Sequence, residues 1–215
     1  MSYQVETRAD MRPWLFLPTS PHPSAGLAPD RAGLPVGAPL AVLFDRDGTL
    51  VRDVPYNGDP DRVSVMPGAA RALRALRERG IATAVVSNQS GVARGLLRRD
   101  QVAAVQARIE DLLGRFDLWA VCPHGPEDGC ACRKPAPGLV LAACAHLGVP
   151  PERAAVVGDI GADVGAARAA GARAVLVPTP QTRPEEVEQA GETAVDLRAA
   201  IRLLLAPAPT AGARA

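Results

Sequence analysis

The chain has 215 residues, enough for one domain with a substantial core, and 47% of them are hydrophobic. A formal net charge of +1 and an aromatic content of 3% give no basis for binding nucleic acid, so we expect no such partner. No stretch approaches the roughly 20 apolar residues that cross a bilayer, and the apolar patch at residues 14–17 is too short for a signal-peptide core. We therefore expect a cytoplasmic protein with no membrane partner.

Proline content sets off the beginning of the chain. Residues 1–39 hold seven of the 21 prolines and show no sustained hydrophobic period, which predicts a Pro-rich N-terminal arm. The patch at residues 14–17 either docks on the domain or on a second copy, or belongs to a loosely attached tail. The main domain is expected over residues 40–205, a flexible tail over residues 206–215, and the protein is expected to be a monomer.

From residue 40, short apolar runs alternate with helical patterns. The expected strands cover residues 40–44, 81–86, 118–121, 154–157 and 174–177. The expected helices cover residues 68–79, 100–113 with Asp100 as N-cap, 138–147, and 163–170. This alternation predicts an α/β fold with a central parallel sheet and helices on both of its faces.

Two carboxylates follow the first expected strand, in the pentapeptide Asp45-Arg46-Asp47-Gly48-Thr49. Open α/β sheets bind ligands at this end of their strands. Asp45 and Asp47 point the same way if the strand geometry persists, and a close carboxylate pair needs a cation or a shared proton. The alternative is an ordinary acidic turn in solvent.

Other polar residues follow the later strands. Ser87 and Asn88 open a turn whose hydroxyl and amides suit phosphoryl oxygens, although an ordinary turn is the alternative. Lys134 is the only lysine among 24 basic residues. Its ammonium is a compact point charge, and the planar guanidinium of Arg does not replace it where a cation must contact a phosphoryl group. Asp159 and Asp163 form a second acidic pair, in which Asp163 is also placed to cap the following helix.

A separate cluster has the spacing C-x-H-x5-C-x-C. Its members are Cys122, His124, Cys130 and Cys132. Three thiolates and one imidazole form the closed tetrahedral set of a structural zinc site, and disulfides are the alternative. Cys144 lies among Ala and Leu in an expected helix, where a buried core thiol is the simpler interpretation.

Taken in chain order, these strand-end residues resemble the four motifs of the haloacid dehalogenase (HAD) superfamily of phosphatases, over roughly residues 40–180. The resemblance implies a Rossmann-like HAD fold in which Asp45 is the nucleophile and Asp47 the general acid/base. It implies that Lys134 is the cation of the third motif and that Ser87 and Asn88 bind the phosphoryl oxygens. The Mg2+ site it implies uses the acidic residues Asp45, Asp47 (through its carbonyl), Asp159 and Asp163.

The cysteine loop narrows the resemblance to the small HAD group without a large cap domain that includes heptose bisphosphate and histidinol-phosphate phosphatases. Residues 87–95 resemble the N-Q-S-G-[IV]-A-R-G loop of the heptose enzymes. This implies a Mg2+-dependent phosphomonoesterase that removes the 7-phosphate of D-glycero-D-manno-heptose 1,7-bisphosphate, with histidinol phosphate or another small sugar phosphate as the alternative. It also implies that Arg94 and Arg133 bind the substrate, although Arg94 could be an exposed loop residue.

The chain departs from that group at two places. Ile160 stands where both enzymes usually carry Lys or Arg, and residues 53–59 differ from the usual heptose-enzyme loop. A polynucleotide phosphatase is disfavoured by net charge and aromatic content, and a silent phosphate-binding module is disfavoured because the expected catalytic residues are present.

Overall fold

The computed structural model describes residues 11–18 and 34–207. They build a six-stranded sheet with the strand order β1-β4-β3-β2-β5-β6. The strands are β1 (Trp14–Phe16), β2 (Ala41–Phe44), β3 (Ala82–Asn88), β4 (Leu118–Cys122), β5 (Ala154–Gly158) and β6 (Arg173–Leu176). Strands β2 to β6 pair in parallel, which confirms the expected α/β class.

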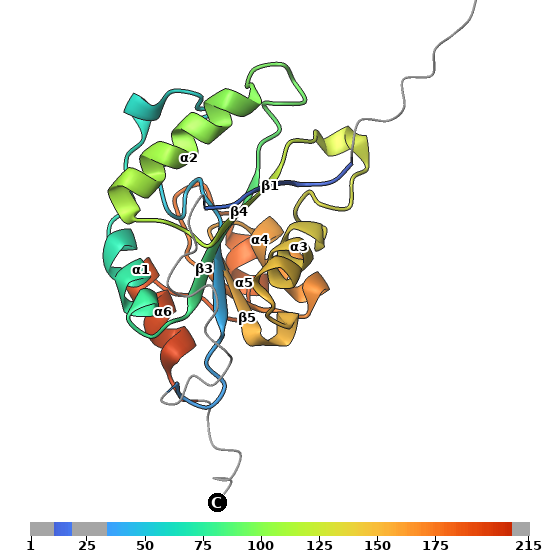
Figure 1. The fold of residues 1–215 in the computed structure, drawn as a ribbon. Coiled ribbons are helices and arrows are strands. Elements are labelled where there is room, and N and C mark those ends of the chain that lie inside the picture. Colours follow the sequence, from blue (N-terminus) through green and yellow to red (C-terminus); the bar gives the residue numbers. More distant parts are fainter. Residues whose placement is uncertain (1–10, 19–33, 208–215) are drawn as a thin grey trace, which may run out of the picture.

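Helices cover both faces of this sheet (Figure 1). They are α1 (Ala69–Arg77), α2 (Arg99–Leu113), α3 (Gly138–Leu147), α4 (Gly161–Ala170), α5 (Pro184–Gln189) and α6 (Leu197–Leu205). One core, with Leu73, Ile109 and Ile201, lies between the sheet and α1, α2 and α6. A second core, with Leu139 and Ala166, lies between the sheet and α3 and α4. Both faces of the central strands are buried, as their continuous apolar runs predict.

Strand β2 lies at the middle of the sheet and sets the position of the site. Phe44, its last residue, pairs with Val85 of β3 on one side and with Val157 of β5 on the other. The polar residues that follow β2 therefore lie between those that follow β3 and those that follow β5. This is the edge of an open α/β sheet where ligands bind.

Strand β1 comes from the N-terminal arm. It pairs antiparallel with β4 at the edge of the sheet, Trp14 opposite Val121 and Phe16 opposite Trp119. The guanidinium of Arg99 lies 5.1 Å from the Trp14 ring centre and 5.2 Å from that of Phe16. The apolar patch thus docks on the domain, and the sheet is mostly rather than wholly parallel. Residues 1–10 and 19–33 of the expected arm, and the expected tail beyond residue 207, lie outside the described residues.

Two expected helix caps are wrong. Asp100 lies inside the first turn of α2 rather than at its N-cap, and its carboxylate accepts hydrogen bonds of 3.0 and 2.9 Å from Arg98. Helix α4 begins at Gly161, so Asp163 is its third residue and accepts from the Ile160 amide at 3.3 Å. In both cases the helix begins before the acidic residue, which therefore lies within the first turn.

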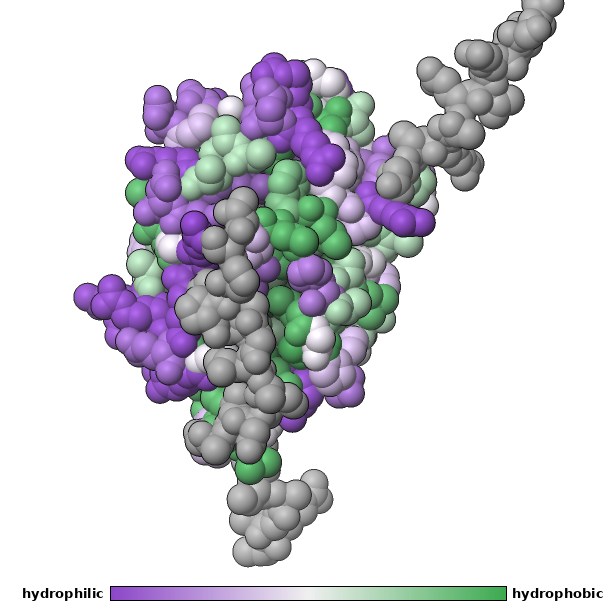
Figure 2. Space-filling view, viewed as in Figure 1, coloured by the Kyte–Doolittle hydropathy of each residue, from purple (hydrophilic) through white to green (hydrophobic). Residues whose placement is uncertain are grey.

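Hydrophilic side chains gather along the flank that α1 and α6 form (Figure 2). Exposed arginines of these two helices, including Arg71, Arg74 and Arg202, account for much of this character. Among the residues the structure describes, every helix is too short or too polar to span a bilayer.

Candidate active site

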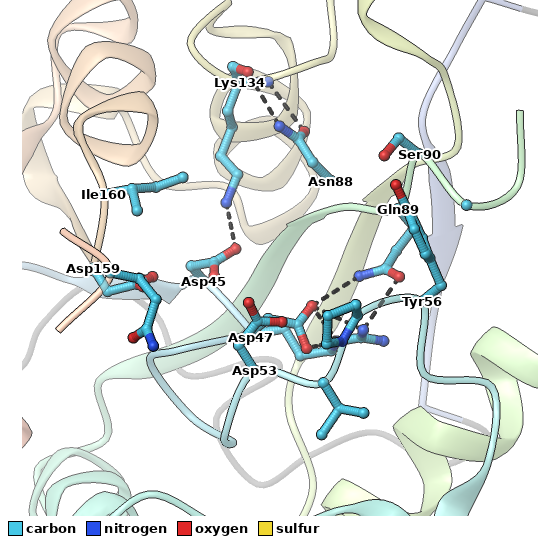
Figure 3. Close-up of a pocket in the computed structure, with 15 residues that line it drawn as sticks. Asp45, Asp47, Asp53, Tyr56, Asn88, Gln89, Ser90, Lys134, Asp159 and Ile160 are labelled. Atoms are coloured by element: carbon cyan, nitrogen blue, oxygen red, sulfur yellow. Dashed lines mark hydrogen bonds and ion pairs between the residues drawn. The ribbon is translucent and has the colours of Figure 1, made fainter. Parts of the chain in front are cut away.

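A cavity of about 280 Å³ opens at the carboxyl ends of β2, β3 and β5 (Figure 3). The residues that line it include Asp45, Asp47, Asn88, Lys134 and Asp159. These five come from four separate segments that the parallel topology brings to one edge of the sheet. Val54, Pro55, Tyr56 and Ile160 add an apolar wall at the same cavity.

Lys134 lies at the centre of the site. Its ammonium donates to Asp45 Oδ1 at 2.5 Å, to Asp163 Oδ1 at 2.6 Å and to the carbonyl of Val86 at 2.8 Å. The side chain is 2% exposed, so all three donors of the ammonium are used within the protein. The backbone of Lys134 is held in turn by Asn88, whose amide donates to the Lys134 carbonyl and accepts from its N–H, both at 3.1 Å.

Burial and like charge shift the titration of these groups. Burial raises the pKa of Asp45 well above its usual range, against the lowering effect of Lys134, and Asp163 adds to the rise. Burial and Asp163 together raise the pKa of Asp159 to about 7. Burial alone would lower the pKa of Lys134, but the charges of Asp163 and Asp45 raise it above its usual range. The ammonium of Lys134 therefore stays protonated and positively charged.

Two glycines let the acidic residues approach the backbone. Gly48 has a positive φ of 79°, and a Cβ at this position would lie 2.2 Å from Asp159 Oδ2. A Cβ at Gly158 would lie 2.3 Å from the Cβ of Asp163. Contacts this short do not occur, so a side chain at either glycine would displace a carboxylate of the site.

Asp47 has a different environment from Asp45. The side chains of Arg46 and Gln89 contact its carboxylate, and neither was a candidate site residue on sequence grounds. The signal for Arg46 in the sequence is its position between Asp45 and Asp47, where this chain carries a cation. The same pattern gives no indication of where that cation points.

The expected substrate-binding residues differ in their position. Asn88 lines the cavity, whereas Ser87 is 1% exposed and its hydroxyl accepts a hydrogen bond of 2.8 Å from Gln89. Ser90 and Gln89 line the cavity beside Asn88. The role of Ser87 as a phosphoryl ligand stays a prediction.

Arg94 and Arg133 do not line the cavity. The Arg94 guanidinium lies 5.6 Å from the ring centre of Tyr56, and Tyr56 does line it. Tyr56 has a φ of +50°, a backbone conformation that residues other than Gly rarely adopt and that is often found at functional sites. Arg133 donates to the carbonyl of His124 at 3.4 Å. Arg94 therefore lies near the mouth of the cavity, over the Tyr56 ring that lines it. Arg133 is directed toward the cysteine loop.

The acidic residues fit a divalent cation. Carboxylate oxygens of Asp45, Asp159 and Asp163 lie within 4.8 Å of one another, and all three residues are buried. When all are ionised, Lys134 leaves two of these negative charges unbalanced, and buried charges need compensation. Oxygen donors of this kind are the ligands that Mg2+ prefers.

The cysteine loop also converges. His124 Nδ1 lies 3.5 Å from Cys122 Sγ and 3.2 Å from Cys132 Sγ, and Cys130 Sγ lies 3.7 and 3.6 Å from the same two sulfurs. Four ligands about 2.3 Å from one centre would be about 3.7 Å apart in a tetrahedron, whereas disulfide sulfurs are about 2.05 Å apart. A hydrogen bond between Cys122 and Cys132 is the main cause that lowers the pKa of Cys122 to about 5, and the same hydrogen bond raises the pKa of Cys132 above its usual range. The donor set fits zinc.

Comparison with known families defines the class of the protein. The model of the haloacid dehalogenase-like hydrolase family matches residues 56–171, more than half of the chain. The chain belongs to this family, as its sequence motifs predict.

Individual relatives of the chain share one named activity. The chain is 38% identical over 143 residues to the D-glycero-beta-D-manno-heptose-1,7-bisphosphate 7-phosphatase of Pseudomonas aeruginosa, covering 64% of this chain and 80% of the relative. It is 34% identical over 184 residues to the enzyme of that name from Escherichia coli, covering 78% and 97%. The crystal structure of D,D-heptose 1,7-bisphosphate phosphatase from B. bronchiseptica, complexed with magnesium and phosphate, superposes with a TM-score of 0.69 at 31% identity, covering 77% and 97%.

Proposed function

We propose that this protein is a Mg2+-dependent phosphomonoesterase that acts through an aspartyl-phosphate at Asp45. The observation that carries the proposal is the convergence of Asp45, Asp159 and Asp163 around the buried ammonium of Lys134. A carboxylate nucleophile beside a fixed cation and a divalent-metal site is suited to the transfer of a phosphoryl group, whose oxygens carry negative charge.

In the first half of the proposed reaction, Asp45 attacks phosphorus in line and the bond to the leaving oxygen breaks. Asp47 donates a proton to that oxygen, so the alcohol departs neutral. Lys134 holds Asp45 in place and, with Asn88 and the amides of the turn at residues 89–91, faces the oxygens of the phosphoryl group. Bound Mg2+, held by Asp45, Asp159 and the carbonyl of Asp47, with Asp163 direct or through water, supplies further charge stabilisation.

In the second half, Asp47 accepts a proton from the water that attacks the aspartyl-phosphate. The phosphorus–Asp45 bond breaks, inorganic phosphate leaves, and both carboxyl groups return to their starting protonation. These two steps need one group that first donates and then accepts a proton, beside a nucleophile that takes no part in proton transfer. The two carboxylates have separate cationic neighbours: Lys134 lies beside Asp45, and Arg46 lies beside Asp47.

For the substrate, we propose D-glycero-D-manno-heptose 1,7-bisphosphate, cleaved at the 7-phosphate. The support is the activity for which relatives that share 34–38% identity with this chain are named. Arg94, placed over Tyr56 at the cavity, is the better situated of the two arginines to meet the phosphate that is kept. Arg133 is the second candidate, because it directly precedes Lys134 in the chain.

For the cysteine loop, we propose a structural zinc ion held by Cys122, His124, Cys130 and Cys132. All four positions of the tetrahedron are filled by protein, so this metal has no open position for chemistry. It lies next to the catalytic segment, because Cys132 is two residues before Lys134. The zinc site would therefore fix the segment that carries the lysine.

The experiment is Mg2+-dependent phosphate release from both anomers of the heptose bisphosphate, beside histidinol phosphate at equal concentration. We expect one heptose anomer to be preferred, with the 1-phosphate retained in the product. A preference for histidinol phosphate would contradict the substrate, and no release from any phosphomonoester would contradict the reaction.

A further inference from the structure

The guanidinium of Arg46 is buried beneath the carboxylate of the residue that follows it. Arg46 is 2% exposed, and its Nε donates to both oxygens of Asp47, at 3.0 and 2.9 Å. Its Nη2 lies 2.8 Å from Asp47 Oδ2. A planar guanidinium that holds both oxygens fixes the direction of a carboxylate as well as its charge.

Gln89 closes this contact into a ring. Its side-chain amide donates to Asp47 Oδ2 at 3.1 Å, and its carbonyl oxygen accepts from Arg46 Nη2 at 3.2 Å. The amide group of Gln89 also donates to Ser87 Oγ at 2.8 Å, which ties the ring to the end of β3. Figure 3 shows Gln89 directed at Asp47, on the side of Asp47 away from Lys134.

Within this ring of contacts, the Asp47 carboxylate remains accessible only on the side of the cavity. The Asp47 side chain is 25% exposed and lines the cavity, whereas Arg46 at 3% is closed off from solvent. A free aspartate turns about two bonds, but contacts to both of its oxygens remove that freedom. The carboxylate is therefore held at the wall of the cavity, beside the place where a leaving group would lie.

We propose that Arg46 and Gln89 are positioning residues that hold the Asp47 carboxylate against the leaving oxygen of the substrate. The inference rests on the proposed phosphatase function, but it is independent of which sugar is cleaved. A positioning residue for the acid matters most when the leaving group needs a proton. Alcohols leave poorly without one, whereas nitrophenolate leaves well unaided.

The test compares kcat/KM for p-nitrophenyl phosphate and for glycerol 3-phosphate in the full-length, Mg2+-loaded protein. This ratio reports the steps up to departure of the leaving group, so it isolates the first half of the reaction. The variants are Arg46→Met and Gln89→Leu, with Asp47→Ala as the reference for loss of the acid. Arg74→Met, an exposed arginine of α1, is the matched control.

We expect Arg46→Met to lower kcat/KM for glycerol 3-phosphate by about 30-fold or more and Gln89→Leu by roughly 10-fold, within the range of general acid catalysis. For p-nitrophenyl phosphate the loss should stay within about 3-fold, as for Asp47→Ala. If Arg46→Met does not fold, Gln89→Leu carries the test alone, because it replaces a neutral group.

Equal losses on both substrates in variants with wild-type melting curves would overturn the inference, because a general distortion of the site does not distinguish leaving groups. Failure of the wild-type protein to release phosphate from these two esters and from the heptose bisphosphate would overturn the proposed function, and the inference with it. The two failures are distinguished by the wild-type rates alone.

Discussion

Gly48 and Asp159 lie in direct contact across two neighbouring strands: a Cβ on residue 48 would fall 2.2 Å from Asp159 Oδ2. We expect Gly48→Ala to push this carboxylate away and lower kcat/KM by about 100-fold, since small displacements of catalytic groups have effects of this size. The Mg2+ concentration for half-maximal activity should rise. Steady-state kinetics with a Mg2+ titration measures both.

Gly171→Ala is the control for that substitution. Gly171 has a φ of +81°, close to that of Gly48, but a Cβ there would have nothing within 4 Å. It should lower stability by about 1 kcal/mol through backbone strain and leave kcat/KM unchanged. Similar kinetics in the two variants would contradict the proposed contact.

Asp45→Asn should abolish turnover without unfolding the protein. The substitution is nearly isosteric and removes a buried carboxylate whose pKa is raised by burial, so no large loss of stability is expected. We expect kcat to fall roughly 1000-fold or more, as when other covalent nucleophiles are removed. Phosphate release and thermal melting check the two parts. Activity within tenfold of wild type would rule out Asp45 as the nucleophile.

The stability of the Mg2+-free protein should fall as pH rises from about 5 to 7 and level off above that range. The pKa of Asp159 is raised to about 7 in the folded protein from an ordinary value of 3.8, so between these values the folded state binds more protons than the unfolded state. The free energy of unfolding therefore decreases with pH in this window. Saturating Mg2+ should flatten the profile, because a cation replaces the proton.

Melting temperatures in Mg2+-free buffer, with zinc retained, measure this effect. Asp159→Asn is the control, since it keeps every other titrating group, including the zinc ligands, and should reduce the slope; Asp45, whose pKa burial also raises, accounts for the remainder. A wild-type profile that matches the variant at every pH would contradict the prediction.

Loss of one thiol from the cysteine loop should remove zinc and stability together. For Cys130→Ser we expect bound zinc to fall well below one per chain and the melting temperature to fall by roughly 10 °C, equivalent to about 3 kcal/mol. Metal analysis and calorimetry measure these. Cys144→Ala is the matched control: this buried thiol lies outside the cluster, and burial raises its pKa to about 11. It should keep full zinc occupancy, and unchanged zinc and melting in Cys130→Ser would contradict the structural-metal proposal.

Much of the fold follows from the sequence, because strands β2, β4 and β5 are buried along their whole length and appear as uninterrupted apolar runs. Strand β1 does not, since its three residues are partly exposed and its position depends on the free edge of β4. Helices α5 and α6 also lie beyond the expected elements. The misplaced caps at Asp100 and Asp163 reflect helix boundaries, which sequence patterns locate least well.

The candidate site, like the fold, is only partly predictable from the sequence. Once the strands are parallel, residues at their carboxyl ends meet, so Asp45, Asn88 and Asp159 converge; Lys134 lies well beyond the end of β4 (Leu118–Cys122), and the strand order does not place it. The direction in which a side chain turns beneath its own loop is not contained in a spacing pattern. That is why the contact of Arg46 with Asp47, and the burial of Ser87 away from the cavity, emerge only in three dimensions.

The docking of β1 has a consequence for anyone who shortens this protein. Trp14, Leu15 and Phe16 occupy the outer hydrogen-bonding edge of β4, and Arg99 stacks against two of their rings. A version that starts at residue 40 keeps every catalytic candidate but bares that edge and the apolar surface beneath it. Exposed strand edges recruit other strands, so such a version should be less soluble and should self-associate on concentration.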